Sequence, residues 1–357
     1  MTTFIQLHLL TAYPAANLNR DDTGSPKTLK FGGAERLRVS SQSLKRAIRT
    51  SDIFADGAGA NIGTRSQTFA RALVTALQRC GLDEKQAIER ARSVVEADGL
   101  GKLKKDTAET EQLVHLGPDE LERLAQLAGA LAEGTSFDKK STLALLEKPK
   151  AVDIAMFGRM LADNPGFNVE AAVQVAHAFT THRVTVEDDY YTAVDDLKSA
   201  DSTADRGAGF IGIQEYGAGL FYLYICIDAD LLLGNLSGDK ALTKAALAAF
   251  TEAAAKVSPR GKQNSFASRA RASYVMAEVG SAVPRTLAAA FLKPVTANGA
   301  DADIAALSIT RLENLREQFE KAYGDVTARV VMNVGAGTGT LAEIIAHATG
   351  AVDAIAA

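Results

Sequence analysis

The chain has 357 residues, 47% of them hydrophobic, with a net charge of −4 and a mean hydropathy near zero. This composition is typical of a globular protein and excludes a largely disordered chain. The net negative charge argues against a general nucleic-acid binder. No apolar run reaches the roughly 18 residues that a membrane-spanning helix needs, so we expect a cytoplasmic protein with no membrane partner.

Positive charge is concentrated near the start of the chain. Residues 1–50 hold eight Lys and Arg against three acidic residues, so this segment carries +5 and the remaining 307 residues carry −9. The distribution therefore predicts a local basic surface on an otherwise acidic protein.

The first predicted element is a core strand over residues 4–13, FIQLHLLTAY, which begins with alternation and ends apolar. Residues 14–35 are rich in Pro, Asn, Asp, Gly and Lys, which predicts a long ordered loop. Leu37 and Val39 then indicate a short extended segment, and we expect a helix after the serines that follow.

The stretch that opens this helix, residues 38–49, reads RVSSQSLKRAIR and suggests a phosphate site. If Lys45, Arg46 and Arg49 lie in the opening turns, each opposes the helix dipole by about 0.3–1 kcal/mol, so an anion is expected there. Backbone N–H groups, serine hydroxyls and a shared face of Lys45 and Arg49 would form a cradle. The alternative is a solvated basic face whose serine only caps the helix.

The loop before this helix contains LNRDD, with one basic residue and two acidic ones. Arg20 is interpreted either as part of a self-neutralising Arg–Asp turn or as a second phosphate contact. Asp21 and Asp22 could form a carboxylate pair for a metal ion, but no further acid or His within reach by spacing supports this. We expect no metal.

Residues 64–160 have a helical pattern with apolar residues at three and four spacing. Asp83 is a candidate N-cap for the second helix of this region, and Pro118 lies just inside the third. The region is interpreted as an inserted helical lobe. Residues 171–183 form a short apolar run that fits a strand or a helix, and a return to the first sheet is preferred.

Short strands joined by a flexible tip are predicted over residues 184–219, which indicates a protruding hairpin. Tyr190 and Tyr191 in this hairpin either contact bases or place one ring in the sheet and one on the surface. Residues 220–228, LFYLYICID, predict a dense core strand, and residues 240–257 predict an Ala-rich amphipathic helix. The mixture of sheet and helix indicates an α+β fold.

A second basic segment, PRGKQNSFASRARA, spans residues 259–272. Arg260, Lys262 and Arg269 are candidate RNA contacts around Phe266, and a solvated basic loop is the alternative. The five histidines do not cluster in sequence, and Cys80 and Cys226 show no metal spacing and are expected to be packed thiols. No residue pattern indicates a catalytic site, and no cofactor is expected.

Nine short motifs occur in order along the first two thirds of the chain: Asn19–Asp22, Phe31–Gly33, Arg38–Arg49, Val152–Ala155, Gly158–Met160, Ala176–Ala178, Thr180–His182, Thr192–Leu197 and Gln214–Glu215. With these motifs the chain resembles the CasC family of the Cas-seven superfamily. These proteins are the repeated backbone subunits of the type I-E CRISPR Cascade surveillance complex. The resemblance covers about the first 300 residues, and the glycine-rich tail has no counterpart in it.

The resemblance implies an RRM-like, ferredoxin-like palm with a helical finger lobe and a β-hairpin thumb. The palm would comprise residues 1–60, a return strand at 173–183 and residues 215–357. The finger lobe would comprise residues 61–172 and the thumb residues 184–214.

The resemblance also implies a function. The protein would be a non-catalytic subunit that stacks in several copies along the CRISPR RNA (crRNA), with target DNA, met through guide pairing, and other Cascade subunits as partners. Tyr191 and Thr192 would fall at the thumb wedge that interrupts the guide–target duplex. The positions that would hold the guide are Arg20, Ser40, Gln42, Lys45, Arg46 and Arg49.

Two other functions remain as alternatives. The segment VVMNVGAGTGTLAEII, residues 330–345, predicts a strand, a glycine-rich turn and a helix, and so suggests an S-adenosylmethionine-dependent methyltransferase using Gly335, Gly337 and Gly339. Only about 18 residues follow the loop, too few for the further β/α units that such a fold requires. A metal-dependent ribonuclease on Asp21 and Asp22 is the second alternative.

Overall fold

The computed structural model describes residues 1–59, 61–97, 100–134, 150–161, 164–193, 210–297 and 303–355. A nine-stranded sheet is its framework, with β1 (Phe4–Ala16) between β10 (Tyr274–Gly280) and β9 (Phe210–Asp228). The described strand pairs are all antiparallel. The main strand order is β11-β10-β1-β9-β7-β3-β2, and β6 and β8 also pair with β9.

The other strands of this sheet are short. They are β2 (Thr28–Phe31), β3 (Ala34–Val39), β6 (Val173–Val175), β7 (Ala178–Thr180), β8 (Glu187–Ala193) and β11 (Ala328–Asn333).

Both faces of β1 are buried because alternate side chains enter two different cores. Ile5, Leu7 and Leu9 belong to the core that lies under the first group of helices. These helices are α2 (Asp52–Gly57), α10 (Ala229–Asn235), α11 (Lys240–Lys256), α14 (Leu341–Gly350) and the 3-10 turn η4 (Ala351–Ala354). Leu10 enters the opposite core, covered by η3 (Ala288–Phe291) and α13 (Ile304–Tyr323).

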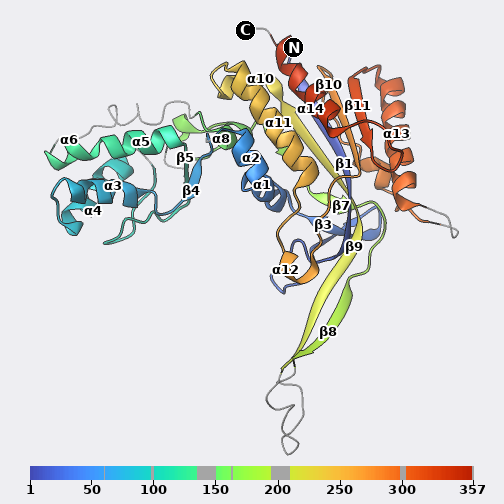
Figure 1. Ribbon diagram of the computed structural model, residues 1–357, viewed down its shortest axis with the longest axis horizontal. Helices are drawn as coiled ribbons and strands as arrows, with labels where there is room; N and C mark the ends of the chain where they lie inside the picture. Colours follow the sequence, from blue (N-terminus) through green and yellow to red (C-terminus); the bar gives the residue numbers. More distant parts are fainter. Residues whose placement is uncertain are drawn as a thin grey trace, which may run out of the picture.

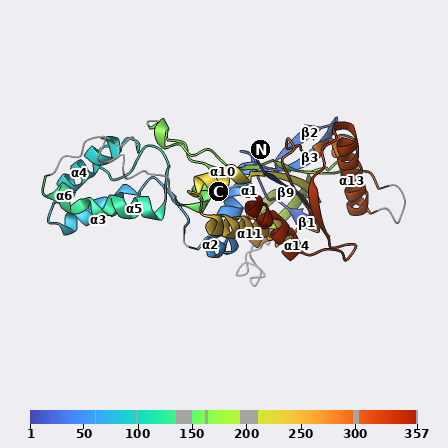
Figure 2. The same ribbon diagram turned by 90° about the horizontal axis from the view of Figure 1, so that it is seen from above.

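A helical lobe projects from one side of the sheet (Figures 1 and 2). Its elements are α3 (Ala70–Arg79), α4 (Glu84–Ala97), α5 (Pro118–Gln126), α6 (Ala128–Ala132) and a two-stranded sheet of β4 (Thr64–Ser66) and β5 (Val114–Leu116). The lobe has its own hydrophobic core, which contains Leu73, Leu77 and Leu124.

The lobe joins the sheet through α8 (Val152–Phe157) and the segment that ends in η2 (Pro165–Phe167). Val152 and Met156 of α8 pack in the main core, whereas Leu161 packs in the core of the lobe. A buried ion pair crosses the same junction, since Arg159 Nη1 lies 2.7 Å from Glu120 Oε1 of α5. Each of these two side chains is 1% exposed.

Several predicted elements are confirmed. The first strand, the helix after the serines, the Asp83 cap, the position of Pro118 and the Ala-rich helix all form. Residues 171–183 return to the first sheet as two short strands, β6 and β7. Both cysteines are free thiols; Cys226 is buried as expected, but the expectation that Cys80 is packed was wrong, because it is exposed.

Three expectations about elements were wrong. Residues 14–35 are not one loop, because β1 continues to Ala16 and β2 starts at Thr28. The strands predicted within residues 210–228 are a single 19-residue strand, β9. The lobe is not entirely helical, because β4 and β5 pair within it.

The arms of the predicted hairpin form as β8 and β9, paired from Glu187 with Tyr216 to Ala193 with Phe210. They extend away from the sheet (Figure 1). The tip of the hairpin, including the end of the TAVDDL motif, lies outside the described residues. Within the described ranges, no helix combines the length and apolar character required to cross a membrane.

Candidate nucleic-acid interface

The basic stretch forms α1 (Ser41–Arg49), and Ser40 is its N-cap. The Ser40 side chain is buried, and its Oγ accepts a hydrogen bond from the backbone N–H of Ser43 at 3.3 Å. The helix has only nine residues, which places Arg46 and Arg49 in its last turn. The expectation that these cations oppose the helix dipole was therefore wrong, because cations near the C-terminus are stabilised by it.

The cations of α1 point to two different flanks. Lys45 and Arg49 both face α8, where Lys45 Nζ lies 5.9 Å from the centre of the Phe157 ring and Arg49 Nη1 lies 3.4 Å from Asp153 Oδ2. Partial burial lowers the pKa of Lys45. The shared face expected for these two residues exists, but Arg46 is on the other flank and lines a separate cleft.

This cleft, of about 420 Å³, brings together residues that are distant in sequence. Arg20 comes from the loop after β1, Arg46 from α1, and Arg260 from the segment after α11. Arg260 donates a hydrogen bond to the backbone carbonyl of Thr50, the C-cap of α1, at 3.2 Å. Within the described ranges, Arg20, Arg46 and Arg260 take part in no ion pair with a carboxylate.

Among the described residues that line this cleft, Asp21 is the one carboxylate, and it accepts hydrogen bonds from its own turn. Its Oδ1 accepts hydrogen bonds from the N–H groups of Thr23 and Ser25 and from the Thr23 hydroxyl. These hydrogen bonds, the Thr23 side chain first, lower the pKa of Asp21. Arg20 therefore does not form the self-neutralising ion pair that its sequence suggested.

A second cleft, of about 940 Å³, adjoins the first because Arg260 lines both. The described part of its lining carries five cations and one acid, namely Lys256, Arg260, Lys262, Arg269, Arg271 and Asp52. The two basic segments found separately in the sequence thus form one surface around the C-terminal end of α1. We call this surface the basic groove, defined by Arg20, Arg46, Arg260, Lys262 and Arg269.

The loop that carries Arg260 and Lys262 is shaped by close packing and contains the short helix α12 (Gln263–Phe266). A Cβ on Gly261 would lie 2.2 Å from the carbonyl oxygen of Leu18, so only glycine fits there. Lys262 has a φ of 51° and donates a hydrogen bond to Gln214 Oε1 of β9 at 3.2 Å. The basic groove is therefore braced against the base of the hairpin.

The hairpin side chains are exposed. Tyr191 lies across its own hairpin, with its ring centre 6.0 Å from that of Phe210 and its Cζ 2.6 Å from where a Cβ on Gly212 would be. Tyr190 is on the opposite face, because successive strand residues alternate, and is 62% exposed. Neither ring is buried, since Tyr191 packs on its own hairpin and remains 44% exposed, and base contact by this pair stays a prediction. Thr192 is exposed as well.

Sequence reasoning missed a further cluster of positive side chains. Arg38 Nη1 donates to His177 Nδ1 at 3.0 Å, and Lys27 is close enough to act on the same ring. Partial burial and the charges of Arg38 and Lys27 lower the pKa of His177. The sequence could have indicated this cluster, since Arg38 opens the basic stretch and His177 lies in the motif Ala176–Ala178. Gln42, by contrast, is exposed on α1 and contacts Ser41.

One of the eight Lys and Arg residues counted in residues 1–50 has a structural role. Arg36 is fully buried and donates to the carbonyl oxygens of Thr180 at 2.9 Å and Phe291 at 2.8 Å. Burial lowers its pKa. The surface charge of residues 1–50 is accordingly lower than the sequence count indicated.

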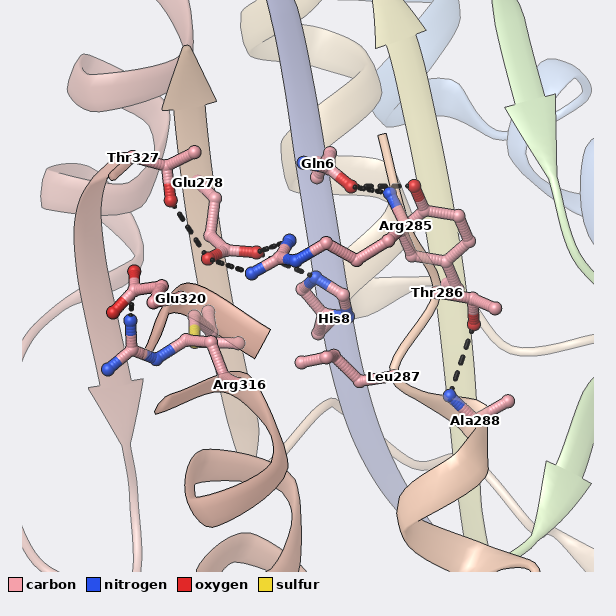
Figure 3. Close-up of polar contacts among 12 residues, drawn as sticks. Gln6, His8, Glu278, Arg285, Thr286, Leu287, Ala288, Arg316, Glu320 and Thr327 are labelled. Carbon is pink, nitrogen blue, oxygen red and sulfur yellow. Dashed lines mark hydrogen bonds and ion pairs between the residues drawn. The ribbon is translucent and has the colours of Figure 1, made fainter. Parts of the chain in front are cut away.

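A buried polar cluster lies on the opposite face of the sheet from α11, and Figure 3 shows Arg285 reaching across β1 towards Glu278. Glu278 Oε2 is 2.7 Å from Arg285 Nη1 and 3.1 Å from His8 Nε2. The Tyr222 hydroxyl lies 2.9 Å from His8 Nδ1. All titratable groups of this cluster bind one another, which indicates a structural role.

The glycine-rich segment forms the expected strand, turn and helix, but it does not form a nucleotide site. β11 is an edge strand antiparallel to β10, whereas a nucleotide-binding fold of this kind uses parallel strands. A Cβ on Gly339 would lie 2.0 Å from the carbonyl oxygen of Val331, so the turn folds back onto its own strand. The methyltransferase alternative is therefore not supported.

The ribonuclease alternative is not supported either. Within the described ranges, no group of three His, Cys, Asp or Glu side chains could hold a metal ion. Asp21 is engaged in its own turn, as described above.

Comparisons with known proteins agree with one another. The model of one family, described as CT1975-like protein, matches residues 5–355. A chain in a solved CRISPR RNA-guided surveillance complex, in a pre-nicking state, is 31% identical with a TM-score of 0.84, over 98% of this chain and all of that one. A chain in another CRISPR RNA-guided surveillance complex is 28% identical with a TM-score of 0.72, over 98% of both chains. Curated proteins give no match.

Proposed function

The chain belongs to the CT1975-like protein family, and on that premise we propose that it is an RNA-binding backbone subunit of a CRISPR RNA-guided surveillance complex. Its guide is a crRNA and its other partners are the remaining subunits of the complex. The similarity to chains of two such complexes over nearly the whole length supports this role.

The observation that carries the proposal is the basic groove. Arg20, Arg46 and Arg260 come from three separate segments and converge on one cleft, and Lys262 and Arg269 extend it. A phosphate backbone binds such a row of cations, and these contacts are independent of base sequence. Ser40 contributes by fixing the start of α1, and Gln42, Lys45 and Arg49 present further polar groups along the same helix.

The finer proposal follows the resemblance to the type I-E CasC proteins. The sheet is the RRM-like palm, the helical lobe the finger domain and the hairpin the thumb. Several copies stack along one guide, and Tyr191 with Thr192 forms the wedge that divides the guide–target duplex into segments. The subunit is non-catalytic, because nuclease activity belongs to another component in such systems.

The test is whether the purified protein carries RNA. We expect a high ratio of absorbance at 260 nm to that at 280 nm, and protection of the bound RNA from nuclease in regular blocks of several nucleotides. Protein that purifies free of nucleic acid, and does not bind added single-stranded RNA, would contradict the proposal. Metal-dependent cutting of RNA that is lost in Asp22→Ala would instead favour the ribonuclease.

A further inference from the structure

Besides Glu120, the junction between the lobe and the sheet contains a second buried carboxylate, that of Asp153 in the first turn of α8. Its Oδ1 accepts hydrogen bonds from the backbone N–H of Gly63 at 2.7 Å and of Ile154 at 3.1 Å. Its Oδ2 lies 2.9 Å from His115 Nε2 and 3.4 Å from Arg49 Nη1. Both oxygens are therefore fully engaged.

These partners come from different parts of the fold. His115 belongs to β5 of the lobe, Gly63 precedes β4, and Arg49 belongs to α1. The packing is close, since a Cβ on Gly63 would lie 2.7 Å from His115 Nε2. Asp153 thus has little freedom to move, and the position of its Oδ2 is set by the frame around it.

Arg49 differs from the other proposed RNA contacts in being held by a carboxylate of this chain. Its side chain is 17% exposed, while that of Asp153 is completely buried. The contact with Asp153 engages one nitrogen of a guanidinium that has five N–H donors in a planar fork. The buried carboxylate therefore contacts one nitrogen of Arg49, a side chain that stays 17% exposed.

We propose that Asp153 is a positioning residue for RNA binding, which orients Arg49 towards a guide phosphate. This inference rests on the proposed function. An arginine without such a partner must be ordered when RNA binds, and ordering one long side chain weakens binding by about two- to tenfold. Asp153 provides that order in the free protein.

The direction in which Asp153→Asn changes RNA affinity tests this positioning role. The Asp153 carboxylate is negative and lies next to a helix proposed to bind RNA. Coulomb repulsion between it and the RNA phosphates alone predicts that Asp153→Asn strengthens RNA binding. Positioning predicts the opposite, a weakening. The direction of the change thus separates the two effects.

The experiment uses the full-length protein and a fluorescein-labelled single-stranded RNA of mixed sequence, with Kd measured by anisotropy over a range of salt concentrations. Four proteins are compared: the wild type, Asp153→Asn, Arg49→Gln and the double variant. We expect Asp153→Asn to weaken binding about two- to tenfold. We expect it to have no further effect when Arg49 is already Gln, because it acts through that side chain.

Glu278→Gln is the matched control, since Glu278 is also a buried carboxylate held by one His and one Arg, but on the far side of the sheet. It should lower the melting temperature without changing the Kd for RNA. If Asp153→Asn does not fold, Asp153→Glu keeps the charge and displaces the carboxylate by one methylene. The same weakening, dependent on Arg49, is then expected.

Three results would overturn the inference. One is tighter or unchanged RNA binding in Asp153→Asn, and another is an equal loss in the wild-type and Arg49→Gln backgrounds. The third is an unchanged Kd in Arg49→Gln while variants of Arg46 and Arg260 weaken binding, which leaves the proposed function intact. A wild-type protein that binds no RNA would remove the function and the inference together.

Discussion

At the level of single residues, the cations of α1 are distinguished by what they contact. Arg49 is held by Asp153 and Lys45 faces the Phe157 ring, whereas Arg46 lines the basic groove. Arg46 and Arg49 lie in the last turn of α1, where the helix dipole stabilises positive charge, and this accounts for part of the basic character of the helix. It does not account for the convergence of Arg46 with Arg20 and Arg260, which come from elsewhere in the sequence.

This distinction predicts the effect of removing the groove cations. Arg46→Gln together with Arg260→Gln should weaken binding of single-stranded RNA by about tenfold or more, because charge-assisted hydrogen bonds are lost. The slope of log K against log salt should fall by about 0.7 for each phosphate contact removed. The loss should be the same for guides of different sequence.

The control for this prediction is Lys321→Gln, an exposed cation in the last turn of α13 on the far side of the sheet. It removes one positive charge from the molecule outside the groove. Equal weakening by this variant would show that net charge, rather than the groove, governs RNA affinity.

The buried cluster around His8 predicts a pH dependence of stability. Burial lowers the pKa of His8 below its ordinary value of 6.5. Burial alone would raise the pKa of Glu278, but hydrogen bonds from His8 and Arg285 hold it well below its usual range. Below pH 6.5 the unfolded chain binds a proton at His8 that the folded chain does not, so stability falls as the pH falls.

We therefore expect the Tm to decrease from pH 7 to pH 5, and His8→Gln to flatten this decrease. A further loss of stability is expected below about pH 4.5, because the unfolded chain then binds a proton at Glu278 that the folded chain does not. His177→Gln is the comparison, because His177 is exposed and should change the profile less. The Tm of each protein is measured by thermal unfolding, monitored by circular dichroism, across this pH range. An unaltered profile in His8→Gln would contradict the assignment.

At the level of elements, the hairpin presents different side chains on its two faces. Tyr191 lies with Phe210 and Gly212 on one face, and Tyr190 lies on the other. Neither tyrosine lines the basic groove, which is formed by α1, the loop after β1 and the α12 loop. The hairpin and the groove can therefore serve different strands of nucleic acid.

From this separation we predict that Tyr191→Ala leaves the Kd for guide RNA within about twofold of the wild type. Pairing of the RNA-loaded protein with a complementary target should change, since an aromatic wedge contributes about 1–3 kcal/mol per stacked base. Target affinity is measured on the RNA-loaded assembly. Tyr190→Ala, on the opposite face, is the control and should have the smaller effect on the target. Loss of guide binding in Tyr191→Ala would refute the division of roles.

Elements with strong periodicity were predictable, and short ones were not. β1, α1 and α11 follow from apolar spacing and a capping serine. β4 and β5 have three residues each, too few for any pattern to register, and they exist because they pair with each other. β9 was predicted as separate strands, although Gly217 and Gly219 lie inside one continuous strand. In the structure they lie where side chains of Leu37 and Thr180 leave no room for a Cβ.

At the level of the whole molecule, the sequence offered candidate members of the site but did not show which of them lie together. Arg46 and Arg260 were both candidates, yet only tertiary packing makes them neighbours. Asp153 was not recognised as an ion-pair partner, because Arg49 is 104 residues away along the chain. A buried acid in an apolar helix indicates that some cation must be near, but the sequence does not say which.

The separate hydrophobic core of the lobe implies that the lobe can lose its structure independently of the sheet. Leu73, Leu77 and Leu124 belong to one core and Ile5, Leu7 and Leu9 to the other. The Arg159–Glu120 pair anchors α5 to the segment after α8. Removing one member of a buried pair leaves the other charge uncompensated, at a cost of about 3–5 kcal/mol.

We therefore expect Glu120→Gln to destabilise the lobe while the sheet keeps its stability. Hydrogen exchange followed by mass spectrometry should show faster exchange in α3, α4 and α5, and unchanged protection in β1 and β9, because separate cores open as separate units. Asp119→Asn is the matched control, since Asp119 pairs with Arg123 on the partly exposed side of the same helix and such pairs contribute little. Faster exchange throughout the sheet in Glu120→Gln would show instead that the lobe and the sheet unfold as one cooperative unit.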